Sequence, residues 1–132
     1  VELNVTDAFE IKLNHDLLTV DAGEIAYEDG IKAQVEGGFL QAASWALYEE
    51  VIFDSKEIIS KDWDSYKIIG FDNIPVFTTS VIDQKGSPYL GVGEVVAGPT
   101  GAAISNALCN ALGQRIKILP FTKDNITKEL LN

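Results

Sequence analysis

Apolar and polar residues alternate irregularly over the first twenty positions of the chain. Ile11, Leu13, Leu17, Leu18 and Val20 lie among polar neighbours with an imperfect period of two. A period of two is typical of strands that are covered mainly on one face. The opening segment is therefore predicted to form one hairpin or two strands.

Residues 31–53 have the spacing of an amphipathic helix. The Asp29-Gly30 pair just before them signals a turn. Within the helix, Gly37 and Gly38 each cost up to about 1 kcal/mol relative to alanine, so we expect another group to approach closely there. The apolar positions recur every three or four residues: Ile31, Val35, Phe39, Ala42 or Ala43, Ala46, Leu47 and Val51.

Loop, strand and helix patterns follow in turn. Residues 54–75 are polar and aromatic and predict an extended loop, and residues 75–83 predict a strand. A second helix is predicted from Pro99 to a stop at Gly113. After it, the sequence predicts a short strand, RIKILP, and a last helical turn or two with Thr122 as N-cap. Residues 1–132 thus predict a single domain of the α+β class, with a mixed sheet and two main helices.

Composition and charge restrict the classes of partner. The chain has 132 residues with 46% apolar content, and its 20 acidic residues against 10 basic ones give a net charge of −10. This charge repels a nucleic-acid backbone and an anionic membrane surface. No apolar run approaches the roughly 18 residues of a membrane span. We therefore expect a soluble, cytoplasmic or periplasmic chain with no nucleic-acid partner and no membrane insertion.

Several conspicuous side chains have ordinary structural interpretations. His15 has no metal-ligand partner in the sequence and is expected at the surface or a strand edge, while Cys109 is expected to pack as a small hydrophobic residue. Trp45 and Trp63 are expected in the core. The acidic residues between positions 49 and 72 do not have the spacing of a calcium loop and are predicted to be solvated.

The candidate chemistry lies in residues 87–101, SPYLGVGEVVAGPTG. Gly91 and Gly93 permit backbone conformations closed to other residues and let a ligand approach closely, which makes Glu94 a candidate general base. Free N–H groups where residues 98–101 open a helix would form an anion site. A nucleotide-phosphate binder is therefore one alternative, although the lysine-containing phosphate loop is missing. The residues alone predict a small-molecule site near the second helix.

Three ordered blocks, together covering about residues 21–120, resemble a known family. They are similar to the C-terminal end of the large subunit of the molybdenum hydroxylases, the xanthine dehydrogenase and aldehyde oxidase family. The similarity is closest to the bacterial branch that resembles isoquinoline 1-oxidoreductase. The blocks are VDAGEIAYEDGIKAQVEGGFLQAASWALYEEVIFD, SKDWDSYKIIGFDNIPVFTTSVID and GVGEVVAGPTGAAISNALCNALGQRIKILP.

The resemblance implies roles for particular residues. Glu94 would be the catalytic base that takes a proton from Mo–OH while an aldehyde or N-heterocycle is oxidised with water as the oxygen source. Gln34 would contact the pyranopterin, to which its amide offers both a donor and an acceptor. Gly93 would let the loop pass close to the metal, and Gly37 and Gly38 would let the helix pack tightly under the cofactor. No metal ligand is expected from this chain.

Cofactors and partners are implied as well. The cofactor would be molybdenum with molybdopterin or molybdopterin cytosine dinucleotide, and electrons would pass to iron–sulfur clusters on a partner subunit. The family's large subunit is several times longer than 132 residues. Residues 1–132 would therefore be the C-terminal part of a cofactor-binding domain, as a fragment or as one piece of a split subunit. Such a chain would be inactive alone, with the remainder of the large subunit as its partner.

One departure from the family pattern and one alternative remain. Many relatives carry two prolines after the glutamate, whereas Val95 and Val96 follow here, so the resemblance implies no particular substrate. The alternative is a non-catalytic acidic interaction module whose glycine-rich turn only shapes a loop. Gln34 and Glu94 separate the two hypotheses, because a scaffold needs neither an amide at the helix start nor a carboxylate in the turn.

Overall fold

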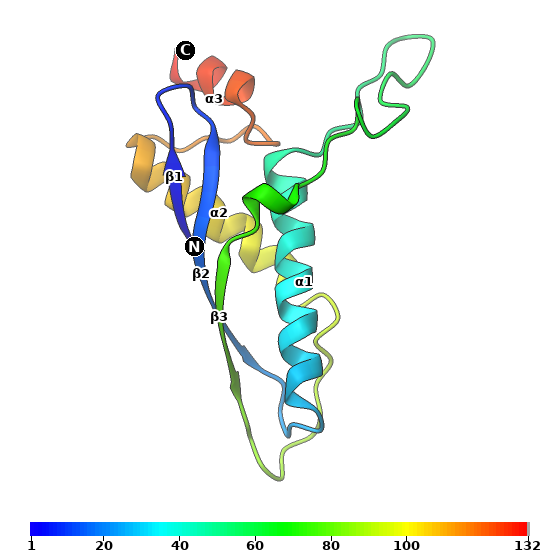
Figure 1. Cartoon of the computed structure of the whole chain (residues 1–132), viewed down its shortest axis with the longest axis vertical. Coiled ribbons are helices and arrows are strands. Elements are labelled where there is room, and N and C mark those ends of the chain that lie inside the picture. Colours follow the sequence, from blue (N-terminus) through cyan, green and yellow to red (C-terminus); the bar gives the residue numbers. More distant parts are fainter. Residues whose placement is uncertain (132) are drawn as a thin grey trace.

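A computed structural model describes residues 1–131. A three-stranded sheet carries helices α1 and α2 on one face, and α3 lies at one end of the molecule (Figure 1). The predicted α+β class, with a mixed sheet and two main helices, is confirmed. The elements are β1 (Glu2–Val5), β2 (Ile11–Asp21), α1 (Glu28–Leu47), the 3-10 turn η1 (Phe71–Asn73), β3 (Val76–Ile82), α2 (Ala97–Leu112) and α3 (Lys123–Leu130).

The central strand β2 pairs antiparallel with β1 and parallel with β3. Its register shifts at a bulge, because Leu3 lies opposite Leu13 while Glu2 lies opposite His15. The extra residue moves the inward-facing positions by one, so Leu13 and then Asp16 are buried. This bulge explains why the sequence showed only an imperfect period of two.

The hydrophobic core lies between the sheet and the two long helices. Phe39 of α1 packs edge-on against Phe77 of β3, with ring centroids 5.5 Å apart, a favoured geometry for aromatic pairs. Alternate residues of β3 are half-buried, as expected for a strand that is covered on one face. The buried cluster consists of Leu13, Phe39, Ala43, Ala46, Leu47, Ile104, Leu108, Ile116, Phe121 and Ile126.

The termini of α2 and α3 follow their capping residues. Gly113 has the left-handed φ of 71° that ends α2, and the Thr122 side chain accepts a hydrogen bond from the Asn125 N–H at 3.3 Å. Both predictions are confirmed. By contrast, α1 ends at Leu47 and not near Phe53 as predicted. The β-branched and aromatic residues that follow Leu47 suit extended structure, and Phe53 forms an antiparallel bridge with Ile58.

The predicted strand over residues 115–120 is wrong, because this segment is not part of any sheet. Its side chains still contribute to packing, since Ile116 is buried. The Lys117 N–H donates to the Glu129 carboxylate at 2.7 Å, and the Phe121 N–H donates to the Ala46 carbonyl at 2.7 Å. Backbone groups here therefore bind α3 and the end of α1 instead of a neighbouring strand.

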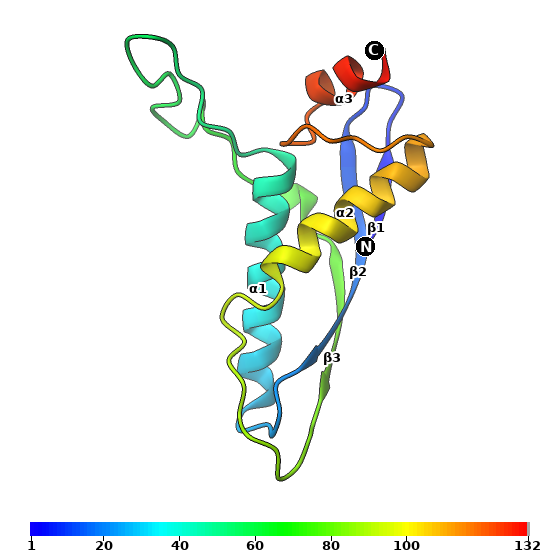
Figure 2. The same ribbon diagram turned by 180° about the vertical axis from the view of Figure 1, so that it is seen from behind.

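Both tryptophans differ from the prediction. Trp45 is 44% exposed and Trp63 is 77% exposed. Trp63 belongs to a segment that projects from the body of the molecule beyond α1, as the two opposite views show (Figure 1 and Figure 2). His15 lies in the central strand and not at an edge, with its Nε2 atom 2.8 Å from the Thr78 hydroxyl. Cys109 is half-buried in α2.

Candidate functional site

The structure brings the three predicted site residues together at one place. Gln34 lies in the first half of α1, and its side-chain Nε2 donates to the backbone carbonyl of Gly93 at 2.8 Å. Gly93 belongs to the connection between β3 and α2, which runs along α1 (Figure 2). Because Gly93 directly precedes Glu94, this bond holds the backbone beside the predicted base. Their roles in binding and catalysis remain predictions.

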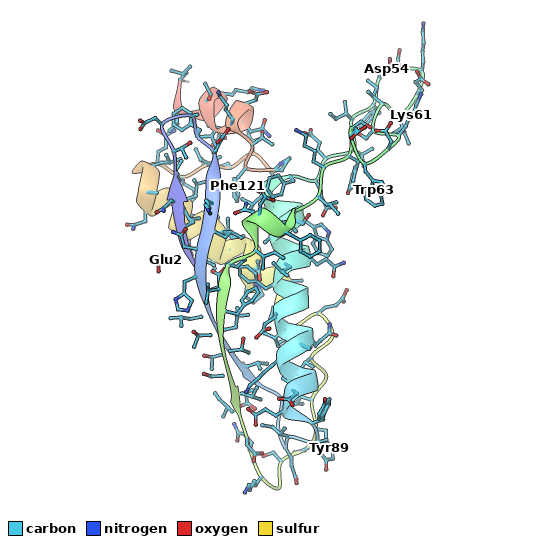
Figure 3. The ribbon with its side chains drawn as sticks, in the orientation of Figure 1. Glu2, Asp54, Lys61, Trp63, Tyr89 and Phe121 are labelled. Atoms are coloured by element: carbon cyan, nitrogen blue, oxygen red, sulfur yellow. The ribbon has the colours of Figure 1, made fainter. Side chains whose placement is uncertain are left out.

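A hollow of about 480 Å³ lies beside the Gln34–Gly93 contact. Small-molecule sites typically have volumes of about 300–1,000 Å³, so the hollow is of suitable size. Tyr27 and Tyr89 line it and are largely exposed, and Tyr89 lies near the N-terminal end of α1 (Figure 3). Sequence patterns did not single out these two tyrosines. The other lining residues are Ala22, Glu24, Ala26, Gly30, Ile31, Leu90 and Val92.

Gly23 lies where the loop after β2 meets the loop after β3, and these two loops line the hollow. Gly23 has a φ of +72°, and a Cβ placed there would lie 2.0 Å from the Pro88 carbonyl oxygen. The Leu90 N–H donates to the Ala22 carbonyl at 2.9 Å, so the loop after β3 is tied to the loop after β2. The Asp21 carboxylate accepts from the Gly23 N–H at 2.9 Å. This Asp-x-Gly turn was a usable signal that the sequence prediction missed.

The glycines predicted to face the cofactor have different surroundings. Among the described residues, no heavy atom beyond its chain neighbours lies within 4 Å of a Cβ placed at Gly93, and the same holds for Gly37. At Gly38 the Cβ would lie 2.9 Å from a methyl group of Val96. The expected close approach thus occurs at Gly38, where the neighbour is a residue at the start of α2. The close packing of α1 at Gly38 is therefore explained by its contact with Val96 of this chain.

The Glu94 side chain is exposed at the entry to α2. Its backbone carbonyl accepts from the Ala97 N–H at 3.1 Å, which forms the turn into the helix. In the described part of the chain, no hydrogen bond or ion pair to the carboxylate is found. Both carboxylate oxygens are therefore available to a group from outside this chain.

The predicted anion site at residues 98–101 is not supported by the start of α2. The Thr100 N–H donates to the Val96 carbonyl at 3.0 Å, and Pro99 has no N–H. Ala97, one position earlier, donates to Glu94. Among the described residues, this leaves the Gly98 N–H as the available donor in the first turn of α2. A single N–H group is too few to bind a phosphate. The nucleotide-phosphate alternative loses its structural basis.

A second hollow, of about 620 Å³, lies at the other end of α1. Leu47 lines it and is 13 residues from Gln34, or about 20 Å along a helix, so the two hollows are separate sites. Its buried residue Asn73 contacts the Tyr48 hydroxyl and accepts from the Leu13 N–H at 3.0 Å. Burial raises the pKa of Tyr48, and the contact with Asn73 opposes that rise. This hydrogen-bonded group joins α1, β2 and η1 and is structural.

Two further properties concern the described residues as a whole. No group of three or more His, Cys, Asp or Glu side chains among them is placed to hold a metal ion. None of their helices is long and apolar enough to cross a membrane.

Comparisons with known proteins identify relatives over nearly the whole chain. It is 31% identical over 121 residues to a nicotinate dehydrogenase subunit of Pseudomonas putida, covering 92% of this chain and 10% of the relative. It is 31% identical over 102 residues to the beta subunit of isoquinoline 1-oxidoreductase of Brevundimonas diminuta, covering 77% and 13%. The crystal structure of quinoline 2-oxidoreductase from Pseudomonas putida 86 matches with a TM-score of 0.87 and 22% identity, covering 96% and 17%.

The chain thus spans between about a tenth and a fifth of the length of these proteins. The model of the molybdopterin cofactor-binding domain family matches residues 1–75, which include Gln34 but neither Gly93 nor Glu94. The putative xanthine dehydrogenase molybdenum-binding subunit of Escherichia coli is 29% identical over 136 residues, covering 98% of this chain and 18% of the relative. With the relatives above, it confirms the predicted resemblance to the xanthine dehydrogenase and aldehyde oxidase family. With more than half of its residues matched by the family model, the chain belongs to the molybdopterin cofactor-binding domain family.

Proposed function

We propose that the chain is part of the large subunit of a molybdenum hydroxylase, where it forms the C-terminal part of the cofactor-binding domain. The observation that carries this proposal is the 2.8 Å hydrogen bond from Gln34 to Gly93. It places an amide suited to the pterin beside the residue that precedes a candidate base. A non-catalytic module has no need for this combination at a hollow of ligand size.

The residues at the hollow fit a polar heterocyclic cofactor. One N–H of the Gln34 amide is used by Gly93, which leaves the second N–H and the Oε1 atom for a ligand. These two groups would bind the donor and acceptor atoms at the edge of a pterin or a phosphate. The open space over Gly93 lets a flat group lie close to the backbone. Since the described residues offer no metal site, this chain would hold the organic part of the cofactor.

In this proposal Glu94 is the general base. Molybdenum cofactor, as molybdopterin or its cytosine dinucleotide, would supply the two-electron oxidation when bound. The exposed Glu94 carboxylate would accept the proton that is released during this oxidation. Gln34 contributes to positioning as well as binding, because its bond to Gly93 fixes the backbone immediately before Glu94.

The substrate class and the partners are also part of the proposal. The relatives named nicotinate dehydrogenase and isoquinoline 1-oxidoreductase bear the names of N-heterocycles, and another is named an aldehyde oxidoreductase. We infer an electron-poor N-heterocycle or an aldehyde as substrate. The remainder of the large subunit would complete the cofactor site, and an iron–sulfur subunit would accept the electrons.

Pterin content of the complete enzyme tests the binding role of Gln34. Gln34→Ala should lower cofactor occupancy, while the occupied fraction still turns over. Gln41→Ala is the matched control, because Gln41 is exposed on the same helix two turns away and does not line the hollow. Equal pterin content in the two variants would remove Gln34 from the binding site.

A further inference from the structure

The projecting arm, defined as residues 51–69, exposes a concentration of apolar side chains. It leaves the end of α1 and extends from the body of the molecule, and it carries Asp54, Lys61 and Trp63 (Figure 3). In the described part of the chain, nineteen large apolar side chains are exposed, and seven of them lie in this arm. The seven are Val51, Ile52, Phe53, Ile58, Ile59, Trp63 and Ile68.

Local hydrogen bonds define the conformation of the arm. Phe53 and Ile58 form an antiparallel bridge, and the Ile59 N–H donates to the Ile52 carbonyl at 2.7 Å. In the turn between them, the Asp54 carboxylate accepts from the backbone N–H groups of residues 56 and 57 at 2.7 and 2.9 Å. A second turn is held by the Asp62 and Ser65 side chains. Residues 52–59 of the arm therefore form a defined hairpin, and its large apolar side chains are exposed.

Apolar side chains lie on both faces of this hairpin. Successive residues of a strand point to opposite faces, so Phe53 and Ile58 share one face while Ile52 and Ile59 share the other. Their exposed fractions are 72% and 55% on the first face and 47% and 48% on the second. A two-stranded hairpin is marginally stable in water by itself. A partner that covers this arm must contact both faces, as a groove does and a flat surface does not.

Given the proposed function, we propose that the arm inserts into an apolar groove formed by the remainder of the large subunit. The match to the quinoline 2-oxidoreductase structure leaves out 4% of this chain, about five of 132 residues, so most of the 19-residue arm lies within the matched fold. More than four-fifths of that longer chain lies outside the match. The relatives thus have ample additional polypeptide to form the groove.

Charge argues against a second copy of this chain as the occupant. Each copy carries a net charge of −10, and like charge opposes close association of two copies. The arm itself is nearly neutral, with Asp54, Glu57, Asp62 and Asp64 against Lys56, Lys61 and Lys67. Its recognition therefore depends on apolar contact, and the groove is predicted to be lined by aliphatic and aromatic side chains.

Hydrogen exchange of the arm amides, in the complete large subunit and in this chain alone, tests the inference. We expect exchange of the amides of residues 51–60 to be at least about tenfold slower in the complete subunit. Equal exchange in both would overturn the inference. So would protection in the isolated chain that increases with concentration, because a second copy would then be the occupant. This comparison uses unmodified protein and depends on no variant.

A pair of variants links the protection to the apolar contacts. Phe53→Ser with Ile58→Ser should abolish the protection in the complete subunit, whereas Lys56→Ser with Asp64→Ser should retain it at unchanged net charge. Retained protection in the first pair would contradict apolar insertion. Cofactor content and turnover are measured separately. A protected arm in a subunit without molybdenum would therefore reject the proposed function and leave the docking inference standing.

Discussion

The Gln34 side chain donates a 2.8 Å hydrogen bond to the carbonyl of Gly93, 59 positions later in the chain. This contact ties helix α1 to the loop that carries Glu94. A single amide therefore both defines the wall of the hollow and fixes the backbone next to the candidate base. The family resemblance nominated Gln34, Gly93 and Glu94 separately, and the structure shows how the first positions the other two.

Loss of this bond should loosen the loop after β3. Gln34→Ala removes one partly solvated hydrogen bond, which typically contributes about 0.5–1.5 kcal/mol. Overall stability of the chain should therefore fall only slightly. Amides of residues 91–95 should exchange faster by hydrogen-exchange mass spectrometry, with Gln41→Ala as control. Unchanged exchange in this segment would show that the contact does not restrain the loop.

Two glycine substitutions should have opposite effects on stability. Gly23→Ala forces an alanine to a φ of +72° and places its Cβ 2.0 Å from the Pro88 carbonyl oxygen, so it should destabilise the chain by roughly 1–3 kcal/mol or more. Gly93→Ala meets open space at an ordinary φ and should be neutral or stabilising by about 0.4–1 kcal/mol. Urea denaturation of both variants measures the difference.

In the complete enzyme, Gly93→Ala should nevertheless lower cofactor content, because its Cβ occupies the space over the loop. Normal pterin content in this variant would argue against a ligand at Gly93. A loss of stability equal to that of Gly23→Ala would contradict the structure of the loop itself.

The buried carboxylate of Asp16 should make the stability of this chain depend on pH. Neither carboxylate oxygen has a hydrogen-bond partner among the described residues. Burial of the side chain raises the pKa of Asp16 above 3.8. The folded state therefore binds the Asp16 proton more tightly than the unfolded state does. The stability contributed by protonation is lost as the pH rises from 3.8 through the raised pKa.

Asp16→Asn removes this titration, so its stability relative to wild type should increase as the pH rises through that window. The measurement is the free energy of unfolding at several pH values. Asp7→Asn, at an exposed turn position, is the control for replacing a carboxylate by an amide. A constant difference between Asp16→Asn and wild type would show that burial does not control this carboxylate.

Secondary structure was predictable where the signals were local. Gly113 ends α2 through its left-handed backbone, and Thr122 starts α3 through its side-chain hydrogen bond. In β3, exposed and half-buried residues alternate because one face of the strand is covered. The prediction of a strand over residues 115–120 was wrong because this backbone binds groups outside any sheet. The Lys117 N–H, for example, donates to the side chain of Glu129 in α3. The predicted end of α1 near Phe53 was wrong because residues 52–59 hydrogen-bond to one another as a hairpin.

The site was predictable only in part. Gly23 carried a turn signal, but the contact between Gln34 and Gly93 joins segments with no shared periodicity. The exposure of Trp63 contradicted the usual burial of tryptophan. Trp63 is exposed because it belongs to the arm, in which seven large apolar side chains are exposed.

Purified alone, the chain should contain no stoichiometric molybdenum and should oxidise neither aldehydes nor N-heterocycles. It spans only about a tenth to a fifth of its relatives, and its described residues include no metal-binding cluster. Elemental analysis of the purified chain provides the test. One molybdenum per chain would show that these residues are sufficient for the site.

The central claim is that Glu94 acts as the base at the site positioned by Gln34 and Gly93. The most direct measurement is the turnover rate of the complete Glu94→Gln enzyme, normalised to its molybdenum and pterin content, with the exposed Glu50→Gln as control. Glutamine keeps the size of the side chain but cannot accept the proton, so turnover should fall by about 10²–10⁴-fold while cofactor content stays near normal. Full turnover at normal molybdenum content would contradict the assignment and make Glu94 an ordinary surface charge.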